Sequence, residues 1–211
     1  FREALIPDGR SFCYGFDFLN EGLCGRTPEL LFEVNNGRLF TVALAGTALA
    51  DGPSLLEDRK ELREHQIVVD GITQSLKGLG LISVGETREV VVGPIKHLKT
   101  PLEIKLSKKP LFEDLVSRLH PTAALGGWPR AAALEYLRQG KKGRRRFGAP
   151  YGYKIGDEML CVVAIRGLQW MGSHATLSTG CGVVEGSLAD KEWLELSYKR
   201  RATAEILGLT K

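Results

Sequence analysis

The feature that most constrains this chain is a tight-turn signal, Asn-Asn-Gly at residues 35–37, placed between two apolar runs. The runs read ELLFEV before the turn and LFTVALAG after it, and both have the composition of β-strands. An Asn-Gly pair favours a β-hairpin because both residues tolerate a positive φ. A further strand-like run, SFCYGFDF, precedes a break at residues 20–22. Residues 11–48 are therefore predicted to form antiparallel strands.

Helical periodicity replaces this pattern over residues 54–77, where five residues are spaced to form one buried stripe: Leu55, Leu62, His65, Val69 and Ile72. Strand patterns return at 89–92, 95–106, 159–168 and 174–184. Further helices are predicted at 111–119, 130–139 and 190–207, with a loop at 122–129. Strands grouped in hairpins, with helices inserted between them, predict an α+β fold with a mainly antiparallel sheet.

Composition narrows the classes of protein to which the chain can belong. With 211 residues, 43% of them hydrophobic, it is able to bury one core, so a single domain over residues 1–211 is predicted. No apolar run is long enough to cross a bilayer, and a net charge of +4 is too small to indicate a nucleic-acid partner. The four cysteines match no zinc or redox motif, which favours reduced thiols. We expect a cytoplasmic monomer.

A basic run occupies residues 141–146, where five of six positions are Lys or Arg. Such a run is able to contact phosphate groups or RNA. It has no interleaved aromatic residues and lies between a predicted helix and a predicted strand, so a solvated loop is the favoured interpretation.

Two carboxylate pairs stand out on the predicted helices. Glu61 and Glu64 lie on the first long helix, and Glu192 and Glu195 lie on the last one. Their i,i+3 spacing places both members of each pair on one helical face. One interpretation is a solvated face with local ion pairs, and the other is a shared site for a cation. Oxygen ligands without His or Cys would favour a hard cation such as Mg²⁺.

Several other positions are candidates for binding or acid-base chemistry. Glycines at Gly46-Thr47 and at Gly180 fall within predicted strands, where they mark either a bulge or a close approach to a ligand. Arg166 at a strand end has a fork that suits a carboxylate, and Lys199 supplies a point charge. His97 is either an acid-base group or a structural residue, and the same alternatives apply to His120.

A series of short words along the chain resembles the chorismate-binding enzymes, which include isochorismate, salicylate, anthranilate and aminodeoxychorismate synthases. The words are TPELLF, LAGTA, KELREH, KHLKT, LHPTAALGGWPR, FGAPYGY, VVAIR, STGCGVV and EWLELSYK. Ala45 stands where one type of aminodeoxychorismate synthase carries a lysine. The HPTAALGG word looks like that of isochorismate and salicylate synthases. The resemblance is therefore strongest to isochorismate synthase, which serves menaquinone or siderophore biosynthesis, with salicylate synthase as the alternative.

The resemblance implies a fold in which antiparallel β-sheets pack together with helices on the outside. It implies that Glu29 is the general acid toward the C4 hydroxyl of chorismate. Mg²⁺ would be held by Glu64 and Glu195, with Glu61 and Glu192 behind them. The remaining implied contacts to the substrate come from Gly46, Thr47, His97, Thr122, Arg166, Gly180 and Lys199.

One departure concerns the general base of the family, a lysine well upstream of the acid. No lysine precedes Glu29 in this chain. We therefore expect either the C-terminal portion of a longer enzyme or a non-catalytic chorismate-binding relative. If it is a portion of a longer enzyme, the isolated chain is expected to bind chorismate weakly or not at all and to turn over little of it.

Overall fold

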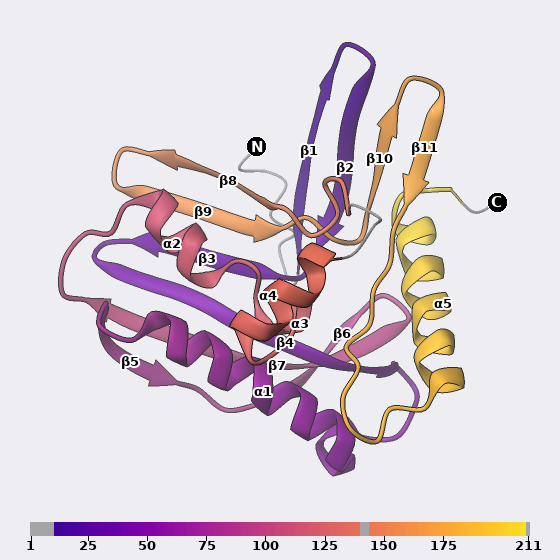
Figure 1. Ribbon diagram of the computed structural model, residues 1–211, viewed down its shortest axis with the longest axis horizontal. Coiled ribbons are helices and arrows are strands. Elements are labelled where there is room, and N and C mark those ends of the chain that lie inside the picture. The colour runs from indigo at the N-terminus through magenta and orange to yellow at the C-terminus, as the bar shows by residue number, and fades with distance from the viewer. Residues whose placement is uncertain (1–10, 140–143, 210–211) are drawn as a thin grey trace.

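Two antiparallel sheets form the framework of the computed structural model, which describes residues 11–139 and 144–209 (Figure 1). The small sheet has the order β1-β2-β10-β11, with β1 at Phe12–Phe18, β2 at Glu21–Thr27, β10 at Gly167–Met171 and β11 at His174–Leu177. The large sheet has the order β5-β7-β4-β3-β9-β8, and β6 also pairs with β7. Its strands are β3 (Leu30–Asn35), β4 (Arg38–Leu49), β5 (Gly80–Val84), β6 (Arg88–Val92), β7 (Ile95–Leu106), β8 (Pro150–Ile155) and β9 (Glu158–Val163).

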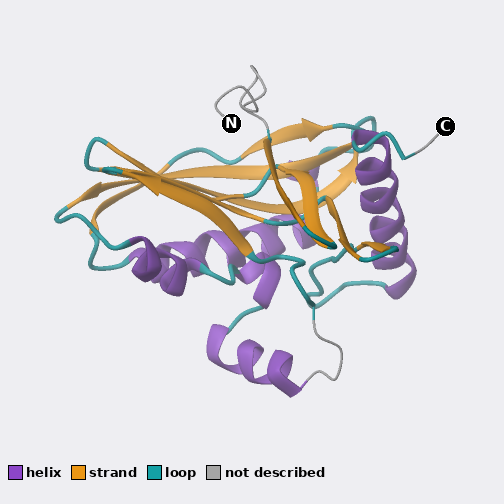
Figure 2. Ribbon diagram, turned by 90° about the horizontal axis from the view of Figure 1, so that it is seen from above, coloured by secondary structure: helices purple, strands orange, loops and turns teal. Residues whose placement is uncertain are grey.

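The helices lie outside the sheets, as Figure 2 shows. They are α1 (Arg59–Leu76), α2 (Phe112–Leu119), α3 (Ala123–Gly126), α4 (Arg130–Gln139) and α5 (Ala189–Ile206), with a short 3-10 turn at Leu55–Glu57. Helix α1 begins at Asp58, whose side chain accepts hydrogen bonds from the backbone N–H groups of Lys60 and Glu61. The predicted α+β fold with antiparallel sheets is confirmed. Within the described residues no helix is long and apolar enough to span a membrane.

The main core lies between the large sheet and helices α1 and α2. Four of the five residues predicted for the inner stripe are buried, and Leu62 is partly exposed. Phe32 on β3 is fully buried and meets the ring of Phe112 edge-on, with the ring centroids 5.2 Å apart. This contact ties the sheet to α2, because Phe112 is the first residue of that helix.

We expect Phe32→Ala to lower the free energy of unfolding by about 4 kcal/mol, because it leaves a cavity where a large ring was fully buried. Urea denaturation followed by circular dichroism measures the change. Phe18→Ala is the matched control, since that ring is 65% exposed on β1. A loss as small as that of the control would contradict the assignment of Phe32 to the core.

A second apolar cluster joins the two sheets around Tyr14, whose hydroxyl donates a hydrogen bond of 2.9 Å to the carbonyl of Ile165. Strand β2 is part of this junction, although the sequence placed a break at residues 20–22, where β2 begins, and no separate apolar run marked this strand. Its glycines make room for large rings, because a Cβ at Gly22 would lie 2.1 Å from the Trp170 ring and one at Gly25 would lie 2.5 Å from the Tyr14 hydroxyl. The glycines that weaken the strand pattern in the sequence are therefore the residues that leave space for the side chains of Trp170 and Tyr14.

Three further sequence predictions need correction. The strand predicted at 159–168 is two strands in different sheets, β9 and β10, and the chain turns between them at Arg166, which has a φ of +56°. The strand predicted at 174–184 ends at Leu177, so Gly180 lies in a loop. The loop predicted at 122–129 contains helix α3. Of the basic run, residues 141–143 lie outside the described residues, while the side chain of Arg146 pairs with Glu21 at 2.8 Å.

Candidate active site

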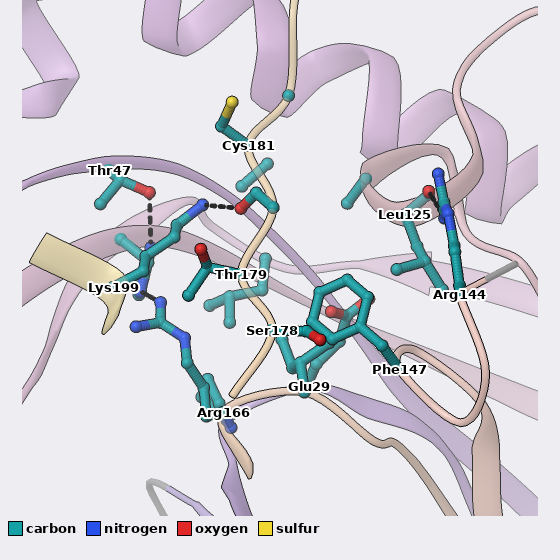
Figure 3. A pocket seen from close by; sticks show the side chains of 18 of the residues that line it. Glu29, Thr47, Leu125, Arg144, Phe147, Arg166, Ser178, Thr179, Cys181 and Lys199 are labelled. Atoms are coloured by element: carbon teal, nitrogen blue, oxygen red, sulfur yellow. Dashed lines mark hydrogen bonds between the residues drawn. The ribbon is translucent and has the colours of Figure 1, made fainter. Parts of the chain in front are cut away.

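A cavity of about 560 Å³ opens where the large sheet, helix α5 and the loop after β11 meet (Figure 3). Its lining comes from distant parts of the chain and includes Glu29, Thr47, Glu64, His97, Arg166 and Lys199. The fold therefore brings together most of the residues that the resemblance assigns to a substrate site. Thr122 is placed behind Glu29, and Gly46 and Gly180 contribute backbone to the wall.

Glu29 is a buried carboxyl group at the start of β3, with 7% of its surface exposed. The hydroxyl of Thr122 donates a hydrogen bond of 3.0 Å to its Oε1 atom. Burial raises the pKa of Glu29 to about 7, although Thr122 and the charges of Lys199 and Arg166 act in the opposite direction. The side chain is thus able to carry a proton near neutral pH.

A bulge in β4 shapes the wall opposite α5. The register between β4 and β7 shifts between Ala45 and Ala48, and Gly46 has a φ of +75°, which favours glycine. The backbone N–H of Thr47 donates to Glu61 Oε2 at 3.0 Å. The bulge therefore links the wall of the cavity to the carboxylates of α1.

His97 on β7 is fixed by hydrogen bonds on both ring nitrogens. Its Nδ1 lies 2.8 Å from the carbonyl oxygen of Gly46 and must donate there, while Nε2 accepts from the guanidinium of Arg166 at 3.1 Å. Burial, together with the charges of Arg166 and Lys199, lowers the pKa of His97 well below its ordinary value. His97 is therefore neutral, and it orients Arg166 toward the cavity.

Two cations face the cavity from different elements. Arg166 is buried, and burial lowers its pKa to about 10 despite the charges of Glu195 and Glu29. Lys199 on α5 donates to the carbonyl of Gly180 at 3.0 Å and pairs with Glu195 at 2.5 Å. Figure 3 shows Lys199 extending toward the loop that carries Thr179 and Cys181, with Arg166 nearby. Together the two groups give this part of the cavity a positive charge.

Three of the four paired carboxylates meet around one ammonium group, that of Lys60, while Glu195 pairs with Lys199. The Nζ of Lys60 lies 2.9 Å from Glu61, 3.3 Å from Glu64 and 3.1 Å from Glu192. Burial alone would lower the pKa of Lys60, but these contacts raise the pKa above its ordinary value. Burial raises the pKa of Glu64, and the charges of Glu61 and Glu195 act in the same direction, opposed by Lys60. Helices α1 and α5 thus converge on a single cluster of acids.

A sequence model of one protein family, described as "Chorismate binding enzyme", matches residues 6–208. The chain belongs to this family. It is 33% identical to a salicylate biosynthesis isochorismate synthase of Pseudomonas aeruginosa, over 90% of this chain and 44% of that protein. It is 32% identical to the isochorismate synthase MenF of Bacillus subtilis, over 96% of this chain and 46% of that protein.

Solved structures agree with the sequence relatives. The menaquinone-specific isochorismate synthase MenF of Escherichia coli superposes with a TM-score of 0.82 at 26% identity, covering 92% of this chain and 48% of that one. Within the chorismate-binding family the chain is thus most like the isochorismate synthases, which confirms the resemblance seen in its motifs. The chain spans about half the length of the relatives it matches.

The carboxylate cluster has the all-oxygen donor set that a hard cation prefers. One oxygen of Glu192, Oε2, is buried and makes no hydrogen bond. A Cβ at Gly182 would lie 2.4 Å from Glu64 Oε1, so the loop backbone lies close against this carboxylate, and a larger residue there would require the Glu64 side chain to move. In the part of the chain that the structure describes, no three His, Cys, Asp or Glu side chains are arranged to hold a metal ion as they stand. The carboxylates have the chemistry to hold such an ion, but in this structure those of Glu61, Glu64 and Glu192 surround the ammonium of Lys60.

Sequence reasoning missed part of the lining of this cavity. The missed residues come from loops, from α3 and from β10 and include Leu125, Arg144, Gln169, Ser178 and Cys181. Loops have no periodicity from which an inward-facing side chain could be predicted. The only available signal was their place inside family words, such as STGCGVV. His120, considered as an acid-base candidate, instead bonds the carbonyl of Gly148 at 2.7 Å.

Proposed function

We propose that this chain forms the chorismate site of a Mg²⁺-dependent isochorismate synthase. The observation that carries the proposal is a buried carboxyl, Glu29, in a cavity that also presents Arg166 and Lys199. A raised pKa keeps a proton on Glu29 near neutral pH, and the two cations suit a substrate with two carboxylates. The product would enter menaquinone or siderophore biosynthesis; one relative is named as menaquinone-specific and another for salicylate biosynthesis.

In the proposed reaction Glu29 donates its proton to the C4 hydroxyl of chorismate. The C4–O bond breaks and its electron pair leaves with the oxygen as water. A second water forms a bond to C2, the two ring double bonds each shift by one position toward C4, and the added water gives a proton to a base. Arg166 and Lys199 hold the carboxylates of the substrate, and Gly46 and Thr47 supply polar contacts from the bulge. His97 lines the ring pocket as a neutral group, because Gly46 and Arg166 fix its tautomer.

The metal of this proposal would be held by Glu64 and Glu195, with Glu61 and Glu192 supporting them. Bound Mg²⁺ would neutralise the ring carboxylate of chorismate and fix it against the cluster. Glu61 is already oriented by the N–H of Thr47, so its carboxylate is held in place before any ligand binds. Glu192 reaches the same cluster from α5.

The base that accepts the proton from the attacking water is a separate question. Among the cavity residues that the structure describes, the one lysine is Lys199. Its ammonium is engaged by Glu195 and Gly180, which suits a carboxylate-binding role better than proton abstraction. We therefore assign Lys199 to binding and leave water activation to a group outside the described lining.

Product analysis tests this function. The complete polypeptide encoded by the gene is incubated with chorismate and Mg²⁺, and the products are separated by liquid chromatography with mass detection. We expect isochorismate alone. Salicylate with pyruvate would identify a salicylate synthase instead. Binding of chorismate without any conversion would identify a non-catalytic chorismate-binding protein.

A further inference from the structure

Lys60 occupies an unusual position for a lysine on a helix surface. A lysine and a glutamate four residues apart commonly form an exposed pair of little energetic consequence. The Lys60 side chain is only 22% exposed, and it contacts three carboxylates. One of them, Glu192, belongs to α5, so the ammonium joins two helices that are distant in sequence.

The charge of the cluster explains why an ammonium is held there. Four carboxylates, from Glu61, Glu64, Glu192 and Glu195, face two ammonium groups, Lys60 and Lys199. The formal charge that remains is minus two while Lys60 is in place and minus three once its ammonium has left, so a divalent cation that replaces the ammonium neutralises the cluster better than Lys60 does. Without Lys60 the cluster would hold acids in close contact with too little compensation, a costly arrangement when they are partly buried.

The dimensions of the cluster point to competition between the ammonium and a metal ion. Carboxylate oxygens lie 2.9 to 3.3 Å from Nζ of Lys60. A bound Mg²⁺ requires oxygens at about 2.0–2.1 Å. The two cations therefore need different spacings of the same oxygens, and both cannot be satisfied at once. The flexible side chain of Lys60 is partly exposed, so its ammonium is able to swing away from the carboxylates into solvent.

We propose that Lys60 is the resident counter-ion of the carboxylate cluster, which a divalent cation has to displace. Lys60 then lowers the affinity of the site for Mg²⁺ while it keeps the acids together when no metal is bound. It is a positioning residue, since it acts through the carboxylates. This inference rests on the proposed function, because it takes the cluster to be the metal site of the enzyme.

Calorimetric titration of Mg²⁺ into the chain, stripped of divalent cations, tests the inference. We expect Lys60→Met to bind Mg²⁺ at least tenfold more tightly than the unsubstituted chain, which corresponds to about 1.4 kcal/mol. We also expect a lower melting temperature in EDTA, with recovery when Mg²⁺ saturates the site. A residue with only a structural role would not give tighter binding when it is removed.

Arg63→Met is the matched control, because Arg63 lies on the same helix and its pair with Glu185 is exposed at both ends. It should leave the Mg²⁺ affinity unchanged. Equal Mg²⁺ affinity in the Lys60→Met variant and the unsubstituted chain would overturn the inference but leave the proposed function standing. Absence of Mg²⁺ binding in both proteins would overturn the metal site itself, and with it the proposed function.

A second measurement needs no variant and so does not depend on whether Lys60→Met folds. Acetylation by an amine-reactive ester, followed by peptide mass spectrometry, reports how accessible each lysine is. We expect labelling of Lys60 to rise severalfold when Mg²⁺ is added, because its ammonium leaves the carboxylates. Lys77, exposed at the other end of α1, should be labelled equally with and without the metal. Unchanged labelling of Lys60 with Mg²⁺ bound would refute displacement.

Discussion

Replacing Glu29 with glutamine is expected to lower the turnover of chorismate by the complete polypeptide by roughly 10² to 10⁴-fold, the usual contribution of a general acid. Glutamine keeps the shape of the side chain and still accepts the hydrogen bond from Thr122, but it has no acidic proton to donate. The Michaelis constant should change much less than kcat. Initial rates of isochorismate formation measure both quantities. A variant with nearly normal kcat would exclude Glu29 as the acid.

The same substitution has a second expected effect, on stability, that does not require activity. The pKa of Glu29 in the folded chain, about 7, lies above its ordinary value of 4.5. The stability that Glu29 contributes is therefore fully present below its unfolded pKa and is lost as the pH rises through 7. The difference in pKa corresponds to a loss of about 3 kcal/mol. Glu29→Gln should escape this loss.

Urea denaturation at pH 5 and pH 8.5 measures the stability effect. We expect Glu29→Gln to be more stable, relative to the unsubstituted chain, at pH 8.5 than at pH 5. Its free energy of unfolding should therefore exceed that of the unsubstituted chain by a larger amount at the higher pH. Glu185→Gln is a control that changes a carboxyl whose side chain is 80% exposed. If the two variants show the same dependence on pH, the carboxyl of Glu29 does not have a raised pKa.

The second large effect is expected at the carboxylate cluster. Glu64→Gln should weaken Mg²⁺ binding by at least roughly a hundredfold, because it replaces a charged ligand of a hard cation with a neutral amide. Glu64 lines the cavity and contacts Lys60, so its loss affects the centre of the site. Isothermal titration of Mg²⁺ into the metal-free chain gives the dissociation constants.

The control for Glu64 is again Glu185→Gln, whose charge lies outside the cluster. It should bind Mg²⁺ as the unsubstituted chain does. Loss of binding in both variants would indicate a diffuse electrostatic effect. Normal binding in Glu64→Gln would remove Glu64 from the set of ligands, and the metal would have to be sought elsewhere.

Much of the fold could be predicted from the sequence because local signals and tertiary structure agree there. The hairpin at residues 35–37 and the helix at 130–139 have strong local patterns, and the structure contains both. Strand β2 could not be predicted, because its glycines serve contacts to Trp170 and Tyr14 that are distant in sequence. The break at Arg166 was hidden for a similar reason, since no glycine or proline interrupts the apolar run VVAIR.

The site was predictable in its residue types but not in its geometry. Spacing placed Glu61 and Glu64 on one face of a helix, yet only the packing of α5 against the same region shows that Glu192 joins them. The role of Lys60 could not be inferred, because a lysine beside two glutamates is ordinary on a helix surface. The hydrogen bond from Thr122 to Glu29 likewise depends on tertiary packing, which brings the residue before α3 to the residue before β3.

Glu29, the two cations and the carboxylate cluster are proposed to form one chorismate site that requires Mg²⁺. Saturation-transfer NMR detects weak binding of chorismate directly. We predict transfer to the chorismate ring protons when Mg²⁺ is present, and its loss in EDTA and in Glu64→Gln. Since coupling between ligands is reciprocal, chorismate should also tighten the binding of Mg²⁺. Equal transfer in Mg²⁺ and in EDTA would contradict the account.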